Sequence, residues 1–246
     1  MKKKNLKKTK FLISIVTVFI VASILGYYFL DKDKTRFDDS PKYHVKGIDV
    51  SHHNPILDWR EVNSQNIAFA YIKATEGVTH NDRNYGYNYK LAKEAGVKVG
   101  SYHFYNFGIS GYDQAKHFID VASCQSGDLL PAIDVEHSSA NPYSSDTAYI
   151  NNTIKELTIL EGELHQYYGL HPVIYTNQDC YKLYIKNRFP NNPIWISSLN
   201  NDPTEDIEKW VIWQFTHTGK LPTVVGDIDF NYFRYPIDRL NEIMLP

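Results

Sequence analysis

The sequence predicts an α/β fold, an irregular (β/α) TIM-like barrel with an incomplete helical ring. Eight short apolar runs, rich in β-branched and aromatic residues, are bounded by Gly, Pro, Asn or Asp, as strands are. Helical patterns separate the early runs, and strands that alternate with helices predict a parallel sheet. The gaps between the last runs are too short for full helices, so we expect the ring to be open on one side.

The expected strands and helices follow in order along the chain. The strand-like runs span residues 45–51, 67–74, 97–105, 129–136, 171–176, 193–198, 210–215 and 224–230. Apolar residues at helical spacing mark 84–96, 112–124 and 146–169 between them. Asp146 is a suitable N-cap for the longest of these helices, and Gly169 follows its end.

The first 30 residues differ from the rest of the chain. Residues 1–10 carry six lysines and no acid, and residues 11–30 are uncharged and mostly apolar. About 20 apolar residues span the hydrocarbon core of a bilayer, and the lysines predict a cytoplasmic N-terminus with an exported remainder. We expect a cytoplasmic basic segment (1–10), one transmembrane signal anchor (11–30) in the cell membrane, a polar linker (31–45) and one large domain (46–246). The alternative is a cleaved signal peptide followed by secretion.

Charge and cysteine content narrow the range of partners. Residues 37–246 hold 17 of the 26 Lys and Arg residues and 26 of the 28 Asp and Glu residues, a net charge of −9. Nucleic-acid binding depends on phosphate neutralisation by cationic side chains, so we expect no nucleic-acid partner.

Export permits a disulfide between Cys124 and Cys180, but the sequence leaves their pairing open. Neither cysteine has a metal-ligand spacing, and we expect neither a metal nor a cofactor.

Polar residues gather at the ends of the predicted strands. In barrels of this type the active site lies at the C-terminal ends of the strands. The side chains at or near these ends are Asp49, Lys73, His103, Asp134, Glu136, Tyr175, Trp195, Gln214 and Asp229. Strand ends are often polar because they are solvated, so one polar residue there is not evidence of a functional site. Acids near the ends of three non-adjacent runs, each preceded by apolar residues, predict a site.

Asp134 and Glu136 lie two positions apart in the run "LLPAIDVE". Residues at this spacing share one face of a strand, so the two carboxyl groups project together and the pKa of one should rise. A carboxylic acid with a raised pKa can protonate a leaving oxygen, and glycoside hydrolysis pairs such an acid with a negative group. Glu136 has the longer side chain and is the expected proton donor. The alternatives are a calcium or magnesium site and a chance pair without chemistry.

Eight motifs together resemble one known family. They are "GIDVSHHN", "AYIKATEG", "GSYHFYNF", "PAIDVE", "PVIYTN", "WISS", "WQFT" and "DIDFNYF", and they span residues 46–235. Their order and spacing are similar to those of glycoside hydrolase family 25, the N,O-diacetylmuramidase-type lysozymes. The resemblance implies an irregular (β/α) barrel with fewer helices than usual. It also implies a peptidoglycan hydrolase that cleaves the β-1,4 bond between N-acetylmuramic acid and N-acetylglucosamine.

The resemblance assigns roles to four acids. Glu136 matches the general acid, and Asp134 matches the partner carboxylate that stabilises the oxocarbenium- or oxazolinium-like intermediate. Asp49 and Asp229 match two further acids of the cleft, although Asp227 also fits the motif "GDID". Two routes stay open, a covalent intermediate on Asp134 and attack by the 2-acetamido group of the sugar, and family resemblance favours the second.

Aromatic and cationic residues near the same strand ends are candidates for substrate binding. Aromatic rings can stack on the apolar faces of sugars, and a lysine can meet a carboxylate of the substrate. The candidates are Lys73, Tyr102, Tyr175, Trp195 and Trp213. The expected partners are peptidoglycan and, through the N-terminal helix, the cytoplasmic membrane, with the chain as a monomer that acts in cell-wall remodelling. The rival functions are a tethered, inactive glycan-binding domain and a hydrolase of another N-acetylhexosamine polymer.

Overall fold

The computed structural model describes residues 37, 42–199, 201–203, 207, 209–222 and 224–246. The predicted basic segment (1–10) and signal anchor (11–30), and most of the linker, lie outside the described residues. Within the described part of the chain, no helix combines the length and the apolar character needed to cross a membrane.

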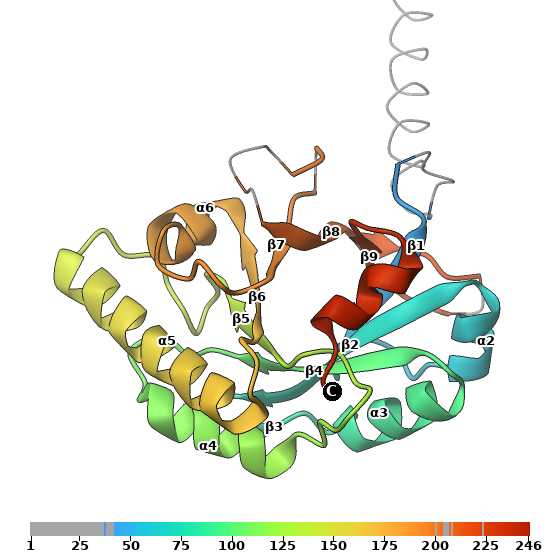
Figure 1. The fold of residues 1–246 in the computed structure, drawn as a ribbon, viewed down its shortest axis with the longest axis horizontal. Coiled ribbons are helices and arrows are strands. Elements are labelled where there is room, and N and C mark those ends of the chain that lie inside the picture. The colour runs from blue at the N-terminus through green and yellow to red at the C-terminus, as the bar shows by residue number, and fades with distance from the viewer. Residues whose placement is uncertain (1–36, 38–41, 200, 204–206, 208, 223) are drawn as a thin grey trace, which may run out of the picture.

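A closed barrel of eight strands forms the centre of the molecule (Figure 1). The strands are β1 (Val45–Val50), β2 (Ile67–Glu76), β4 (Lys98–Phe104), β5 (Ala132–Val135), β6 (Val173–Asn177), β7 (Ile194–Ser197), β8 (Trp210–Gly219) and β9 (Ile228–Phe233). The sheet closes because β1 pairs with both β2 and β9. The short strand β3 (His80–Asn81) pairs with the end of β2 outside this ring.

The expectation of a wholly parallel sheet is wrong for the last strand. Strands β1 to β8 pair in parallel around the ring, whereas β9 is antiparallel to both β8 and β1. A parallel crossover needs about a dozen residues or more, and the connection 220–227 is too short for one. The chain therefore reverses in a hairpin. The start of β9, rather than its end, lies beside the C-terminal ends of the other strands.

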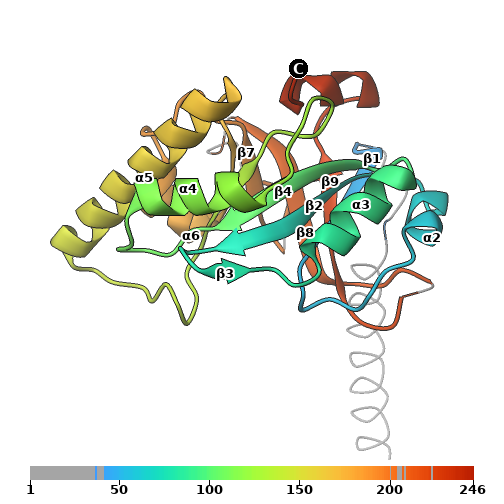
Figure 2. The ribbon, with the colours of Figure 1, turned by 90° about the horizontal axis from the view of Figure 1, so that it is seen from below.

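The helices cover only part of the barrel, which confirms the incomplete helical ring. They are α2 (Trp59–Ser64), α3 (Tyr85–Glu94), α4 (Gly111–Val121), α5 (Thr147–Tyr168) and α6 (Gln178–Cys180), which runs into a π-helical turn (Tyr181–Ile185). Figures 1 and 2 show α3, α4 and α5 on one side of the sheet, whereas the side formed by β7, β8 and β9 carries no such layer. The sequence predicted α3, α4 and α5, and Asp146 caps α5 by accepting from the amides of Ala148 and Tyr149.

Two packed layers of side chains stabilise the barrel. One lies between the strands and the helices, and the other fills the interior, where Tyr71 stacks on Trp195 with ring centroids 4.8 Å apart. Gly47 makes room for the interior rings, since a Cβ at this position would lie 2.2 Å from the ring of Phe69. A 3₁₀ helix (Ile237–Ile243) contributes Leu240 and Ile243 to the interior cluster. The interior is thus filled by side chains at its base, and a cavity opens at the other end.

Candidate active site

A small cavity of about 80 Å³ lies at the mouth of the barrel. Its lining residues are Asp49, Tyr102, Asp134, Glu136, Tyr175, Trp195, Gln214 and Asp229. All four acids proposed from the sequence therefore meet in one place, with three of the five proposed binding residues. The alternation of strand side chains explains this convergence, because each residue points inward at the end of the barrel where the parallel strands end and β9 begins.

Asp134 lies on β5 and is buried, with 7% of its surface exposed. Its Oδ1 atom is buried and has no hydrogen-bond partner among the described residues. Burial and the nearby Glu136 carboxyl raise the pKa of Asp134 well above its usual value, while the charge of Lys73 opposes this rise. A buried oxygen without a partner is costly, so Asp134 is poised to accept a hydrogen bond from a group that enters the cavity.

Glu136 follows β5 directly and is half-buried. Burial, followed by the charge of Asp49, raises its pKa to about 7, and the charge of Lys73 partly offsets this. A carboxyl group with this pKa is substantially protonated near neutral pH and becomes a base once its proton has left. Glu136 can therefore serve as both acid and base.

Asp49 and Asp229 form a second carboxyl pair across the β1–β9 ladder, where they are direct partners. Asp49 Oδ2 accepts hydrogen bonds from Gln214 Nε2 at 3.0 Å and from Asn231 Nδ2 at 2.7 Å. Burial raises the pKa of Asp49, and the hydrogen bonds from Asn231, Gln214 and Asp229 oppose the rise. The pKa of Asp229 rises to about 9 through burial, the charge of Asp49 and the hydrogen bond between them. Asp229 thus holds the proton that the pair shares.

We expect Asp229→Asn to stabilise the fold at alkaline pH. A carboxyl group with a raised pKa binds its proton in the folded chain at a pH where the unfolded chain has lost it, so wild-type stability falls between about pH 4 and 9. An Asn amide can donate to Asp49 without this dependence. The free energy of unfolding should therefore rise by on the order of 1–2 kcal/mol at pH 8 and be unchanged near pH 4. Urea titrations at pH 4, 6 and 8 measure this, and parallel pH profiles for both proteins would contradict it.

Lys73 and Trp213 are not among the residues that line the cavity. The ammonium of Lys73 is buried beside the mouth, 2.7 Å from Glu76 Oε2 and 4.7 Å from the centre of the Phe104 ring. Its charge acts on Asp134 and Glu136 from there. Trp213 lies on the opposite face of β8 from Gln214, and its indole N–H donates to the Ser198 carbonyl at 2.9 Å.

The aromatic residues of the cavity are packed rather than free. Trp195 is only 2% exposed, and its indole N–H donates to Asn231 Oδ1 at 2.7 Å. The hydroxyl of Tyr175 donates to Gln214 Oε1 at 2.9 Å. These rings fix the acids in place and offer a small surface to a sugar.

Another sequence candidate, His103, has a structural role. His103 is buried on the helix-facing side of β4, with Nδ1 2.7 Å from Thr75 Oγ1 and Nε2 3.2 Å from Gln114 Oε1. Burial lowers the pKa of His103 to about 3, so it is neutral. Cys124 and Cys180 are both free thiols in this structure.

Sequence reasoning missed Asn231, which connects Asp49 to Trp195 and is fully buried. The available signal was its spacing, because Asn231 follows Asp229 by two residues and shares its face of β9.

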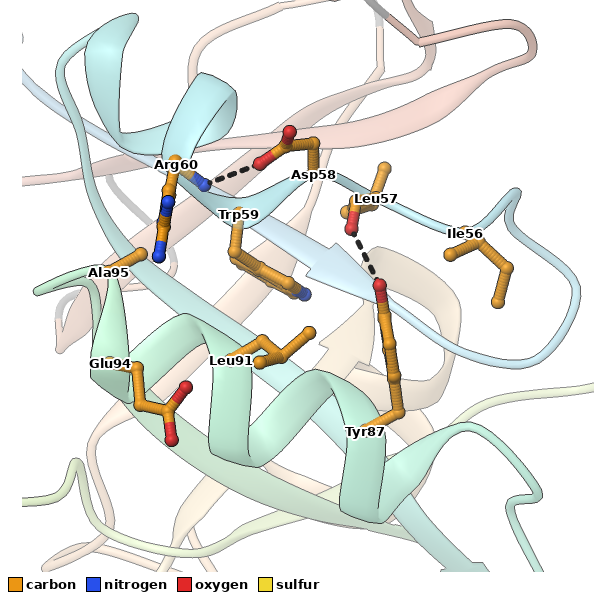
Figure 3. Close-up of a pocket in the computed structure, with 9 residues that line it drawn as sticks. All are labelled: Ile56, Leu57, Asp58, Trp59, Arg60, Tyr87, Leu91, Glu94 and Ala95. Carbon is orange, nitrogen blue, oxygen red and sulfur yellow. Dashed lines mark hydrogen bonds between the residues drawn. The ribbon is translucent and has the colours of Figure 1, made fainter.

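A larger hollow, of about 550 Å³, lies between the start of α2 and the outer side of α3 (Figure 3). Two of its polar side chains are hydrogen-bonded within the fold: Asp58 accepts from the Arg60 amide at 3.0 Å, and the hydroxyl of Tyr87 donates to the Leu57 carbonyl at 3.5 Å. It lacks paired buried acids, so size does not make it the better catalytic candidate.

A protonatable glutamate beside a second buried carboxyl group is the arrangement that glycoside hydrolases use. The family model of glycosyl hydrolases family 25 matches residues 48–224. Lysozyme M1 of Streptomyces globisporus is 32% identical over 212 residues, 80% of this chain and 70% of the relative. The chain belongs to glycosyl hydrolases family 25 and is a glycosidase of the lysozyme type.

Solved structures agree with this assignment. A family 25 glycosyl hydrolase from Bacillus anthracis is 34% identical, with a TM-score of 0.77 over 84% of this chain and 96% of that chain. A bacterial lysozyme from Streptomyces coelicolor is 28% identical, with a TM-score of 0.75 over 84% of this chain and 98% of that chain.

Proposed function

We propose that this peptidoglycan hydrolase cleaves the β-1,4 bond between N-acetylmuramic acid and N-acetylglucosamine, with Glu136 as general acid and Asp134 as its partner. The relatives named lysozyme support the substrate class. The observation that carries the assignment of roles is the buried, unpartnered Oδ1 of Asp134 beside a glutamate with a pKa of about 7. An N–H group of the sugar would supply the missing hydrogen bond.

The proposed reaction has two steps. Glu136 donates its proton to the glycosidic oxygen, and the bond from this oxygen to the anomeric carbon breaks. The carbonyl oxygen of the 2-acetamido group attacks that carbon, and Asp134 accepts a hydrogen bond from the acetamido N–H and stabilises the positive oxazolinium ring. Glu136, now a carboxylate, takes a proton from water, whose oxygen opens the ring. Two inversions retain the configuration, as in other substrate-assisted hydrolases.

Asp49 and Asp229 would act through electrostatics rather than proton transfer. The charge of Asp49 raises the pKa of Glu136 and keeps its proton in place. Asn231, Gln214 and Asp229 hold the Asp49 carboxylate in one orientation. This network would also favour positive charge that develops at the reacting sugar.

Product analysis tests the bond assignment. The full chain, purified in mild detergent, is incubated with peptidoglycan, and the soluble products are reduced with borohydride. We expect muramitol as the new reducing end. NMR spectra of the unreduced products, recorded during the reaction, should show the β-anomer formed first. Glucosaminitol would overturn the bond assignment, an α-anomer would overturn the retaining route, and binding without release would favour an inactive glycan-binding domain. Equal activity on chitin would favour the broader N-acetylhexosamine hydrolase.

The activity should fall on the alkaline side of neutral pH. Glu136 must be protonated to act, and its pKa is about 7, so kcat/KM should fall about tenfold for each pH unit above that value. Initial rates between pH 5 and 9 measure this. A fall in kcat/KM that already begins near pH 4.5 would show that Glu136 has an ordinary pKa.

We also propose that residues 11–30 hold the catalytic domain at the outer face of the cytoplasmic membrane, where it remodels the cell's own wall. The support is the apolar stretch after six lysines. The N-terminal sequence of the protein recovered from membranes tests the anchor: an intact N-terminus is expected, and cleavage near residues 21–23 would mean secretion.

A further inference from the structure

Three side chains with metal-ligating atoms converge at the end of α5. Glu161 and His165 lie one helical turn apart, and His171 precedes β6. One ligand atom from each lies within 4.8 Å of the other two, and within the described part of the chain no other three His, Cys, Asp or Glu side chains meet this criterion.

The local fold explains the convergence. Gly169 adopts a left-handed conformation, with φ of +77°, and ends α5. The chain then turns back toward the barrel, so that His171 returns over the last turns of the helix. Figure 1 shows the end of α5 followed by the short segment that leads into β6.

The geometry of the three side chains is compact. His171 Nδ1 lies 2.6 Å from Glu161 Oε1, and the rings of His165 and His171 stack with centroids 3.7 Å apart. Glu161 is 8% exposed, whereas both histidines are half-buried. The cluster is therefore open to solvent on the histidine side and anchored on the carboxylate side.

A fourth residue orients the carboxylate. Asn192 Nδ2 donates to Glu161 Oε1 at 3.0 Å and to the Pro172 carbonyl at 2.9 Å. Asn192 is itself buried. Metal-binding carboxylates typically have such outer hydrogen bonds, which fix their direction.

We propose that Glu161, His165 and His171 bind a divalent metal ion of the zinc class. Two imidazole nitrogens and one carboxylate oxygen suit Zn²⁺, with water as the fourth ligand. Calcium and magnesium prefer sites made of oxygen atoms. The ion would replace the hydrogen bond between His171 and Glu161 and connect α5 to β6.

This site lies away from the cavity. His171 precedes the first residue of β6, whereas Tyr175, further along the same strand, lines the cavity at the opposite end of the barrel. The bound ion is therefore structural, and it stabilises the folded chain without entering the reaction. Its presence does not depend on the proposed catalytic roles.

The test is metal binding by the full chain in detergent. After treatment with EDTA and its removal, wild type should bind Zn²⁺ with a rise in Tm of about 5 °C at a concentration 100-fold above Kd. His165→Phe keeps a ring against His171 but removes the nitrogen, and it should weaken this binding at least about 100-fold. His44→Gln, at an exposed histidine, is the matched control and should behave as wild type.

A second variant and a spectrum protect the test against misfolding. Glu161→Gln keeps the size of the side chain and should bind one Zn²⁺ ion fewer per chain than wild type, as His165→Phe should. Co²⁺ in place of Zn²⁺ should give the visible absorption of a four-coordinate ion in wild type and not in either variant. Zn²⁺ stoichiometry that is the same in wild type and both folded variants would overturn the proposal, as would the absence of Zn²⁺ binding by wild type.

Discussion

Glu136→Gln should lower kcat/KM on peptidoglycan by about 10³–10⁴-fold, since general acid catalysis contributes up to about this factor. Gln has nearly the same shape as Glu but has no proton to donate to the glycosidic oxygen. Among the described residues no hydrogen bond is found to the Glu136 side chain, only one from Asn141 to its backbone carbonyl, and the residue is half-buried. The variant should therefore fold as wild type does. Initial rates of release of soluble reducing ends measure the loss.

A matched acid-to-amide change separates this effect from a general change in charge. Asp227 lies two residues before Asp229 and is another candidate that the sequence offered for the fourth acid, but its side chain is 53% exposed and forms an ion pair with Lys220. It does not line the cavity. Asp227→Asn should therefore retain wild-type activity, whereas equal losses in the two variants would remove the special role of Glu136.

A change in the leaving group of the substrate provides a second test of the role of Glu136. A substrate with an activated aryl leaving group needs little protonation when its bond breaks. Glu136→Gln should therefore recover a large part of its first-step rate on such a substrate, seen as a burst of aryl alcohol. Loss of the same size on both substrates would show that Glu136 acts by positioning or structure.

The convergence of the acids could be predicted from sequence because strand alternation is a local rule. The spacing of Asp134 and Glu136 placed both on one face, and the position of each acid in its run placed it near the mouth. The same rule shows that Trp213 and Gln214, as neighbours on β8, face opposite ways. It does not say which of the two faces the interior, and here Gln214 does.

The direction of β9 and the hydrogen bonds of Asp49 could not be read from the sequence. An apolar run has the same pattern in either direction, so the run 224–230 did not reveal that β9 returns in a hairpin after the connection 220–227. Asn231 and Gln214 reach Asp49 across more than 160 positions of the chain. Such contacts follow from barrel closure. The cluster of Glu161, His165 and His171 likewise depends on a turn that local patterns do not specify.

Asp134→Asn should lower kcat about 10²–10³-fold, the usual effect of removing one preorganised electrostatic group. The amide keeps the size of the carboxyl group but lacks the negative charge that stabilises the oxazolinium ring. In the free enzyme burial favours the neutral form of Asp134, so the variant should be at least as stable as wild type. The positive charge of the oxazolinium ring favours the carboxylate during the reaction, and Asn has no such form. Single-turnover rates on peptidoglycan and thermal unfolding measure the two effects.

A substrate without the acetyl group distinguishes the two possible roles of Asp134. If Asp134 acts through the 2-acetamido group, a substrate without the acetyl group already lacks the rate enhancement that Asp134 provides. Asp134→Asn should then lower the rate on that substrate only a little further. The two changes are thus expected to be strongly non-additive, as coupled groups are. If Asp134 forms a covalent bond to the anomeric carbon, the variant should lose the same factor on both substrates. Additive losses would therefore overturn the substrate-assisted route while leaving Glu136 as the acid.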